Sequence, residues 1–394
     1  NFFINDKIKE EDQEQYHMRL EEELDVLEYQ GFSSYMLIVA DYTNWAKNNG
    51  IAIGPGRGSC ASSLVGRIIG IHQVNPLKYG LIFARFQNKQ RTSPPDIDQD
   101  IATSGKDLVY NYIENKYGKD NVASISNLNR ITSKVYVRDI SRSYELGGSK
   151  EQAVQIGDAV ASFIPKEIKS AKNLLEVPMF TEYGKKYPPL IDNLAILNKV
   201  RAFSTHAAAA VIGKRPLVGL VPLRKDKDNN WSIEYDKDNT EENGLIKMDL
   251  LGLSTLDLIE NTISLIKENN KEFNNEHLLY DDNDEKTYKL ITEGNTYGVF
   301  QFGTSSGTID LCKKIKPKCI EDLAIITTLA RPAAANIREE FIETREGKRE
   351  YKLLHPSLHN AFNETFGFGL YDESILKLGQ DVAGWNLNEA DKIR

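Results

Sequence analysis

The sequence has few cysteines, no long apolar run and no excess of positive charge, and each shortage argues against a class of protein. Its three cysteines, Cys60, Cys312 and Cys319, fit neither an even disulfide framework nor a zinc-binding spacing. We interpret them as packing residues of a cytoplasmic protein. No apolar run reaches the roughly 20 residues that cross a bilayer, so no membrane role is expected. No secretory signal opens the chain, and Asn1 without an initiator Met favours a fragment or a processed form.

The formal net charge of −8, taken alone, argues against a nucleic-acid partner. It does not decide the matter, because a polymer of phosphates responds to local basic patches and an acidic metal site adds negative charge of its own. An apolar content of 40% is enough for ordinary globular cores, and 394 residues predict about two to three domains. We find no internal repeat and no low-complexity segment.

Three aspartates, Asp96, Asp98 and Asp100, alternate with Ile97 and Gln99. In an extended strand all three carboxylates point to the same face. Like charges held so close repel one another unless a cation lies among them, and rigid oxygen ligands suit Mg²⁺. The alternative is a solvated strand end, which is the commoner origin of an isolated Asp-x-Asp pattern. The pattern therefore leaves two interpretations, between which other segments must decide.

A second strand is predicted at residues 245–250, where Lys247 and Asp249 share one face and apolar side chains occupy the other. A lone aspartate among leucine and methionine residues is costly to bury unless it meets a cation or a hydrogen-bond donor. Asp249 is therefore our best candidate for a third metal-binding carboxylate.

A short strand at 51–53, the loop Gly-Pro-Gly-Arg-Gly-Ser at 54–59 and a helix at 60–71 form a possible anion site. Such a loop before a helix presents free backbone N–H groups to a phosphate. Arg57 adds a charged fork and Ser59 a hydroxyl donor. The loop is neither a Walker A motif, since no Lys follows its last Gly, nor a dinucleotide motif. The alternative is a tight turn with a solvated arginine.

Two further basic segments are candidates for phosphate contact. Residues 83–91 interleave basic side chains with Phe83 and Phe86, and we prefer phosphate contact over a plain surface element. Lys134, Arg138 and Arg142 recur every four residues, so on a helix they form one basic stripe. We favour contact with a DNA backbone, and the alternative is a solvated face paired with Asp139 or Glu145.

The remaining segments predict mainly helices. Helices are expected at 14–49 (two), 105–118, within 154–200, and at 255–269, 285–293, 307–315, 320–330 and from 388. A buried strand is expected at 207–212, with a hairpin around 226–230. Neither 226–230 nor 281–284 fits a calcium loop; the latter is expected to cap a helix. His206 is interpreted as structural.

Two strands with carboxylates and a Gly-Ser loop at a helix start together predict a nucleotidyltransferase site. Two Mg²⁺ ions in such a site activate an attacking hydroxyl and stabilise the leaving oxygen, while the protein positions the phosphates.

At this point the chain resembles the bacterial replicative DNA polymerase III alpha subunits, the C family. The resembling stretches include GPGRGSCASSLVGRIIGI, RTSPPDIDQD, KVYVRDISR, LIKMDLLGLSTL, KPKCIEDLAIITTLARP and AGWNLNEADKIR, in the family's order from about residue 15. The resemblance implies an α/β fold: a polymerase beta-like nucleotidyltransferase palm with a mixed sheet, an inserted helical thumb and helical fingers. The implied bounds are 1–127 and 205–254 for the palm, 128–204 for the thumb and 255–394 for truncated fingers.

Matched position by position, the resemblance implies three sets of residues. The catalytic metal ligands would be Asp96, Asp98 and Asp249, with Asp100 in a supporting role. The incoming nucleotide would meet Arg57, Gly58, Ser59, Arg85 and Lys247. Lys134, Arg138 and Arg142 match a basic helix after the palm carboxylates, and their contact with DNA is inferred from spacing.

The implied reaction is template-directed DNA synthesis with two Mg²⁺ ions, in which a primer 3′-hydroxyl attacks a dNTP and pyrophosphate leaves. The expected partners are primer-template DNA, dNTPs and replisome proteins bound through regions absent here. The chain departs from the family at Ser62-Ser63, Ala333-Ala334 and 371–374, which bears on nucleotide fit and fidelity. The sequence lacks the family's amino-terminal metallohydrolase-like domain, the rest of its fingers and its clamp-binding modules. A phage or mobile-element relative and a truncated chain explain this equally well. A template-independent nucleotidyltransferase and a non-catalytic DNA-binding or regulatory polymerase relative remain as alternatives.

Overall fold

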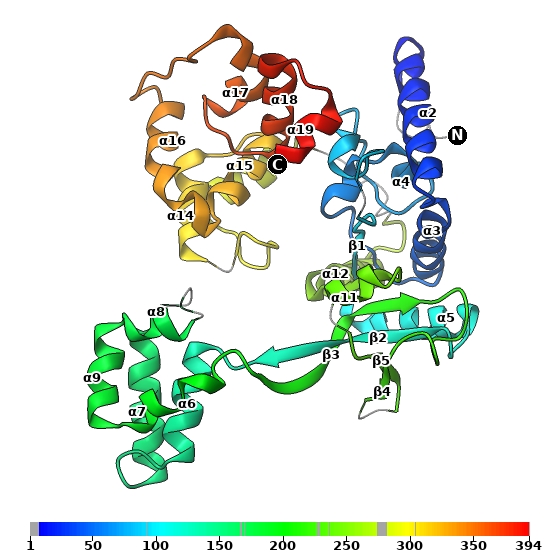
Figure 1. The fold of residues 1–394 in the computed structure, drawn as a ribbon. Helices are drawn as coiled ribbons and strands as arrows, with labels where there is room; N and C mark the ends of the chain where they lie inside the picture. The colour runs from blue at the N-terminus through cyan, green and yellow to red at the C-terminus, as the bar shows by residue number, and fades with distance from the viewer. Residues whose placement is uncertain are drawn as a thin grey trace. The chain divides into compact units, whose positions relative to one another are not determined.

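The computed structural model describes residues 8–91, 93–165, 168, 170–226, 229–235, 237–273, 282–303 and 305–393. The protein is a mixed α/β structure with many helices (Figure 1). It divides into two compact units, the first formed by Asn1–Gly118 with Ile246–Arg394 and the second by Lys119–Leu245. No helix in the described part of the chain combines the length and apolar character that crossing a membrane requires.

The first unit begins with two helices, as predicted. A short 3₁₀ turn, η1 (Glu10–Asp12), precedes α2 (Gln13–Tyr29) and α3 (Ser33–Asn48). Gly31 follows α2 with a φ of 73°, a left-handed conformation that glycine adopts without steric cost and that ends the helix. The expected strand at 51–53 is reduced to one bridge, between Ile53 and Ile101.

The expected continuous helix at 60–71 is wrong, because the segment forms two short pieces. These are the 3₁₀ helix η2 (Ser59–Ser62) and α4 (Leu64–Ile68). Ser63 between them is extended, and its hydroxyl accepts a hydrogen bond from the Gly66 N–H, so it acts as the N-cap of α4. An N-cap residue has a non-helical backbone, so a cap at Ser63 interrupts the helix that was expected to continue through it. A further 3₁₀ turn, η3 (Phe83–Arg85), follows.

Two parallel strands form the centre of the first unit, β1 (Asp98–Ile101) and β6 (Ile246–Gly252). Asp98 lies opposite Asp249, and Ile101 lies opposite Gly252. Ile97 and Gln99 are buried, so Asp96, Asp98 and Asp100, which alternate with them, share the other face. After β1 come η4 (Thr103–Gly105) and α5 (Lys106–Tyr117), and after β6 comes α12 (Ser254–Asn269).

The carboxyl-terminal half of the first unit is helical, as expected. Its helices are α13 (Glu285–Thr292), α14 (Ser306–Ile315), α15 (Ile320–Leu329), η6 (Pro332–Ile337), α16 (Arg338–Arg345), η7 (Pro356–Leu358), α17 (His359–Phe362), η8 (Asn363–Thr365), α18 (Asp372–Ala383) and α19 (Leu387–Ile393). Cys312, Ile326, Leu329 and Phe341 are fully buried in its core, so Cys312 is a packing residue, as predicted. Asp284 caps α13 by accepting from the Lys286 N–H, which confirms the predicted cap, while residue 281 lies outside the described residues.

The second unit combines a mixed sheet with a helical cluster. Strand β2 (Val122–Arg130) pairs antiparallel with β3 (Val200–Ile212) and parallel with β5 (Trp231–Ile233), which pairs antiparallel with β4 (Leu223–Lys225). The predicted hairpin is confirmed, but its first strand lies at Leu223–Lys225 and not at the expected 217–223. Residues 227 and 228 of its turn lie outside the described residues. The predicted strand at 207–212 is confirmed and starts earlier, at Val200. The side chain of His206 lies outside the described part.

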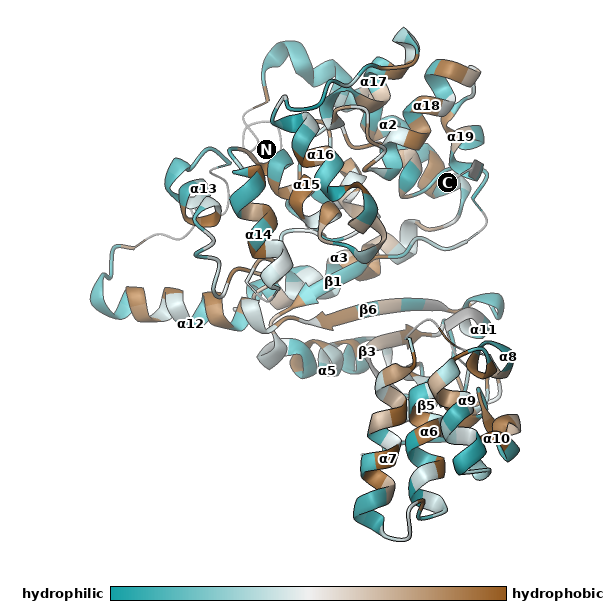
Figure 2. Cartoon of the chain, turned by 90° about the vertical axis from the view of Figure 1, so that its left-hand side faces the viewer, coloured by the Kyte–Doolittle hydropathy of each residue, from teal (hydrophilic) through white to brown (hydrophobic). Residues whose placement is uncertain are grey.

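The helices of the second unit lie beyond one end of the long strands β2 and β3 (Figure 1). They are α6 (Ser133–Ser143), α7 (Lys150–Phe163), α8 (Ala171–Leu175), α9 (Pro178–Lys186) and α10 (Pro189–Asp192), with η5 (Leu194–Ile196). A further helix, α11 (Lys237–Glu242), comes later in the chain, between β5 and β6. Figure 2 shows apolar stripes on α6 and α7, and residues of these stripes, among them Val137, Ile140 and Val160, form a buried core. This core is separate from the one under the sheet, which contains Ile125, Val211 and Ile233.

Candidate metal and nucleotide site

Three carboxylates predicted from the sequence to bind metal lie together. The parallel register places Asp98 opposite Asp249, and Asp96 precedes β1 by one residue. Each of the three offers one oxygen, and these oxygens lie within 4.8 Å of one another. The predicted convergence of two distant chain segments is therefore confirmed.

Two cations partly neutralise this cluster. Lys247 pairs with Oδ2 of Asp249, from the same face of β6, as the alternation predicted. Arg57 Nε lies 3.8 Å from Asp98 Oδ2, and its Nη1 donates to Asp100 Oδ1 at 3.0 Å. The pKa of Asp98 is raised by its partial burial and by the neighbouring Asp96 and Asp249, although Arg57 and Lys247 oppose the shift. Burial and the neighbouring carboxylates thus disfavour the charged form of Asp98, and a bound cation would favour it.

The cluster fits a divalent cation. Asp249 is only 4% exposed, and its Oδ1 has no hydrogen-bond partner among the described residues. A buried carboxylate oxygen without a donor is costly, and a cation removes that cost. All the available ligands are carboxylate oxygens, which suit hard divalent ions such as Mg²⁺.

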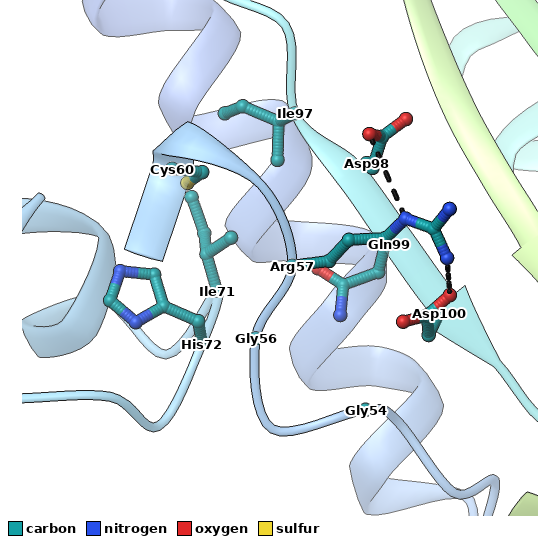
Figure 3. Close-up of a pocket in the computed structure, with 10 residues that line it drawn as sticks. All are labelled: Gly54, Gly56, Arg57, Cys60, Ile71, His72, Ile97, Asp98, Gln99 and Asp100. Atoms are coloured by element: carbon teal, nitrogen blue, oxygen red, sulfur yellow. Dashed lines mark hydrogen bonds and ion pairs between the residues drawn. The ribbon is translucent and has the colours of Figure 1, made fainter. Parts of the chain in front are cut away.

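The glycine loop at 54–59 runs beside β1, and its side chain Arg57 reaches both Asp98 and Asp100 (Figure 3). The Gly54 N–H donates to the Asp100 carbonyl at 2.9 Å, and a Cβ on Gly54 would lie 2.8 Å from the Asp100 Cβ. Gly58 has φ 64° and ψ −157°, a conformation essentially confined to glycine, and a Cβ there would lie 3.8 Å from Asp98 Oδ2. Glycines therefore let the loop lie directly against the carboxylates.

The expectation that the following helix presents free amides to an anion needs correction. The Leu64 and Val65 N–H groups donate to the buried carboxylate of Glu23, each at 2.9 Å. The Gly66 N–H donates to Ser63. The first turn of α4 is therefore already capped, and Arg57 and Gly58, ahead of it, lie next to Asp98.

Sequence reasoning missed Glu23, although one signal pointed to it. Glu23 occupies the same helical stripe as Tyr16, Leu20 and Leu27, where an apolar residue is expected. A carboxylate in such a stripe requires donors from another element, and in the structure it has them.

Arg85 is not part of the carboxylate cluster. Its Nη1 donates to Glu373 Oε1 at 2.6 Å, and its Nη2 lies 3.4 Å from Asp372 Oδ2, both at the start of α18. The neighbouring Phe83 and Phe86 are buried, so packing of these two rings fixes the position of η3. Its role as a triphosphate contact stays a prediction.

The basic stripe on α6 is largely paired. Arg138 bonds to Asp158 of α7 at 2.6 Å, and Arg142 bonds to Asp139, also at 2.6 Å. Lys134 has no ion-pair partner within the described part of the chain. The ion-pair alternative thus applies to the two arginines, and contact of the stripe with DNA stays a prediction.

Comparison with known families decides where the chain belongs. The model of the bacterial DNA polymerase III alpha NTPase domain matches residues 3–252, and the model of the bacterial DNA polymerase III alpha subunit finger domain matches residues 255–394. The chain belongs to the bacterial DNA polymerase III alpha family. This confirms the resemblance drawn from the sequence motifs. Membership of this polymerase family implies use of a divalent metal, and the cluster of Asp96, Asp98 and Asp249 could bind one.

Individual DNA polymerase III alpha subunits resemble the chain over nearly its whole length. It is 36% identical to the one from Aquifex aeolicus over 97% of the chain and 38% identical to the one from Borreliella burgdorferi over 94%. It is 36% identical to the one from Thermus aquaticus over 94% of the chain. These matches cover 35%, 32% and 31% of those polymerase subunits, so the chain spans about a third of their length.

Proposed function

We propose that the protein carries the catalytic part of a template-directed DNA polymerase, which adds dNTPs to a primer 3′-hydroxyl and releases pyrophosphate. The observation that carries the proposal is the convergence of Asp96, Asp98 and Asp249 beside a glycine loop. Its family membership supplies the reaction class, since its relatives are named as DNA polymerase III subunits.

Within this proposal the chain has the parts of a polymerase. The palm comprises residues 1–127 and 205–254 and holds β1 and β6 with the carboxylates. The thumb comprises 128–204 with the helices α6–α10, and the fingers comprise 255–394. Primer-template DNA is bound with help from Lys134, Arg138 and Arg142, the two arginines exchanging carboxylate partners for phosphates.

Each side chain of the site has a separate task. Two Mg²⁺ ions held by Asp96, Asp98 and Asp249 supply activation of the primer hydroxyl and neutralisation of the leaving pyrophosphate. The Gly58 and Ser59 segment offers N–H and O–H donors to the triphosphate. Arg57 and Lys247, now paired with carboxylates, are cations next to the position where the phosphates bind.

Primer extension in Mg²⁺ tests the proposal. Asp98→Asn and Asp249→Asn should each lower extension by about 10³-fold or more, because each removes a charged ligand that stabilises the transition state. Binding of primer-template DNA should stay within a factor of about two, since the proposed DNA contacts are basic side chains of α6.

Asp107→Asn is the matched control, because Asp107 is an exposed aspartate of α5. Extension at the wild-type rate in either cluster variant would refute the mechanism. Omitting the template separates templated synthesis from template-independent transfer, since only the former adds bases that follow a template. Binding of primed DNA without incorporation by the unaltered protein would identify a non-catalytic relative.

A further inference from the structure

Helix α2 carries an ion pair with a buried carboxylate, which lies outside the carboxylate cluster. Glu23 is 0% exposed, and Arg19, one helical turn earlier, donates from Nε to Glu23 Oε1 at 2.7 Å. Burying a carboxylate is costly, so a single partner from the same helix does not account for its presence. The other hydrogen bonds of Glu23 and Arg19 show which segments the pair connects.

Glu23 holds the end of the loop segment. It accepts hydrogen bonds from the Ser63 hydroxyl and from the Leu64 and Val65 N–H groups, each at 2.9 Å. These groups form the junction between η2 and α4. The carboxylate also complements the positive end of the helix dipole, so it fixes where α4 begins.

Arg19 holds two segments at once. Its Nη2 donates to the Ser62 carbonyl at 2.8 Å and to the Leu81 carbonyl at 3.1 Å. Its guanidinium also lies 5.8 Å from the centre of the Phe83 ring. Ser62 closes the 3₁₀ turn that starts at Ser59, and its hydroxyl donates to the Ser59 carbonyl at 2.6 Å.

The two segments that Arg19 joins each carry a candidate triphosphate contact. One contains Ser59, at the first position of η2, and the other contains Arg85, at the last position of η3. The planar guanidinium has several donors in fixed directions, so it sets the spacing of the two carbonyls it bridges. A change in that spacing moves one phosphate contact relative to the other.

We propose that Glu23 and Arg19 are positioning residues, which hold the loop of Ser59 and the segment of Arg85 at the spacing that binds a dNTP triphosphate. The proposal rests on the proposed polymerase function. It deepens that function by assigning nucleotide affinity to an ion pair on α2 that is not part of the carboxylate cluster.

The test is the split between KM for dNTP and kcat in primer extension by the protein with its full chain. Glu23→Gln should raise KM for dNTP about ten- to a hundredfold, because a small misplacement of binding groups has effects of that size. The value of kcat should change less than about threefold, since the metal ligands keep their places. Mn²⁺ titration of the protein without DNA should give an unchanged affinity.

Arg19→Lys is the second variant, because a lysine keeps the charge but has one nitrogen in place of the Nε that holds Glu23 and the Nη2 that holds both carbonyls. It should raise KM for dNTP in the same way. Glu22→Gln is the matched control, since Glu22 is the exposed neighbour on the same helix, and it should leave KM and kcat unchanged.

The other outcomes overturn the proposal. A merely structural role would lower the folded fraction, and so the apparent kcat, with KM unchanged. Loss of the folded state in both variants, judged by circular dichroism while Glu22→Gln stays folded, would likewise assign the pair to the fold. Failure of the proposed function gives a different pattern, because the wild-type and Glu22→Gln proteins would then extend no primer.

Discussion

Arg57 illustrates how a single side chain can serve two states of the site. In the structure its guanidinium reaches Asp98 and Asp100 from a loop that contains three glycines. A half-exposed arginine pays little to leave such partners, because water screens the pair. The same fork matches a phosphate as well as it matches a carboxylate. Within the proposed function, Arg57 holds the carboxylates together in one state and binds a triphosphate in the next.

His72 is a second informative residue, because it is buried at the back of the pocket behind the loop. Its Nε2 lies 2.9 Å from the Ser63 carbonyl, and its Nδ1 has no hydrogen-bond partner among the described residues. Burial lowers the pKa of His72 to about 4, and the charges of Arg67 and Lys47 act in the same direction. The bond to Ser63 opposes the shift without reversing it.

We predict that His72 makes the protein less stable in mild acid. The unfolded chain takes up a proton near pH 6.5 and the folded chain near pH 4, so the stabilisation is present above pH 6.5 and lost as the pH falls toward 4. Between pH 7 and pH 4.5 the free energy of unfolding should fall by about 2 to 3 kcal/mol more in the wild type than in His72→Gln.

Urea unfolding at the two pH values measures this difference. His359→Gln is the control, because His359 is exposed. Equal losses of stability in the wild type and in His72→Gln would contradict the prediction.

At the scale of the element, the Gly-Ser loop depends on backbone conformation more than on side chains. Gly58→Ala should lower the free energy of unfolding by about 2 to 3 kcal/mol, since its φ and ψ lie in a region essentially confined to glycine. Gly384→Ala is the matched control: Gly384 also has a positive φ, in the ordinary left-handed region, with open space around it. It should cost only about 1 kcal/mol. Chemical denaturation measures the free energy of unfolding of both variants. Equal losses would contradict the prediction and show that the loop adjusts its backbone without cost.

The elements also show what the sequence could predict. Alternation of aspartate with Ile97 and Gln99 is a local signal, so the strand face of Asp96 and Asp98 was predictable. The shared strand face of Lys247 and Asp249 was predictable for the same reason, while their ion pair was not predicted. The convergence of the two strands required the chemical argument that a buried aspartate needs a cation, since no local pattern encodes a parallel register.

Other features depend on contacts that no local pattern encodes. The break at Ser63 depends on a hydrogen bond to Glu23 from α2. The local sequence of 60–71 does not show this contact, so it predicted one continuous helix. The ion pair of Arg85 with Glu373 depends on how α18 packs. Spacing alone made the stripe of Arg138 look unpaired, because its partner Asp158 lies on another helix.

At the scale of the molecule, the second unit has the cores of an independently folding domain. One core lies among the helices α6–α10, and the other lies under the sheet of β2–β5. We predict that Lys119–Leu245 expressed alone melts cooperatively, because both its cores are built from its own residues. Circular dichroism on heating measures this. Residues 60–186, a segment of equal length that crosses the boundary, should show no such transition, and a featureless melt of both would contradict the prediction.

The insertion of the second unit between β1 and β6 also sets an order of events during synthesis. Asp98 leaves the ribosome well before Asp249, and the whole of Lys119–Leu245 must be translated between them. At about 5 to 20 residues per second, the roughly 150 residues from Asp98 to Asp249 take about 8 to 30 s. A nascent chain in this interval lacks Asp249, so the cluster of three carboxylates can form only after the inserted part has been made. Premature termination anywhere in that part yields a product that can fold in places but cannot assemble the three-carboxylate centre.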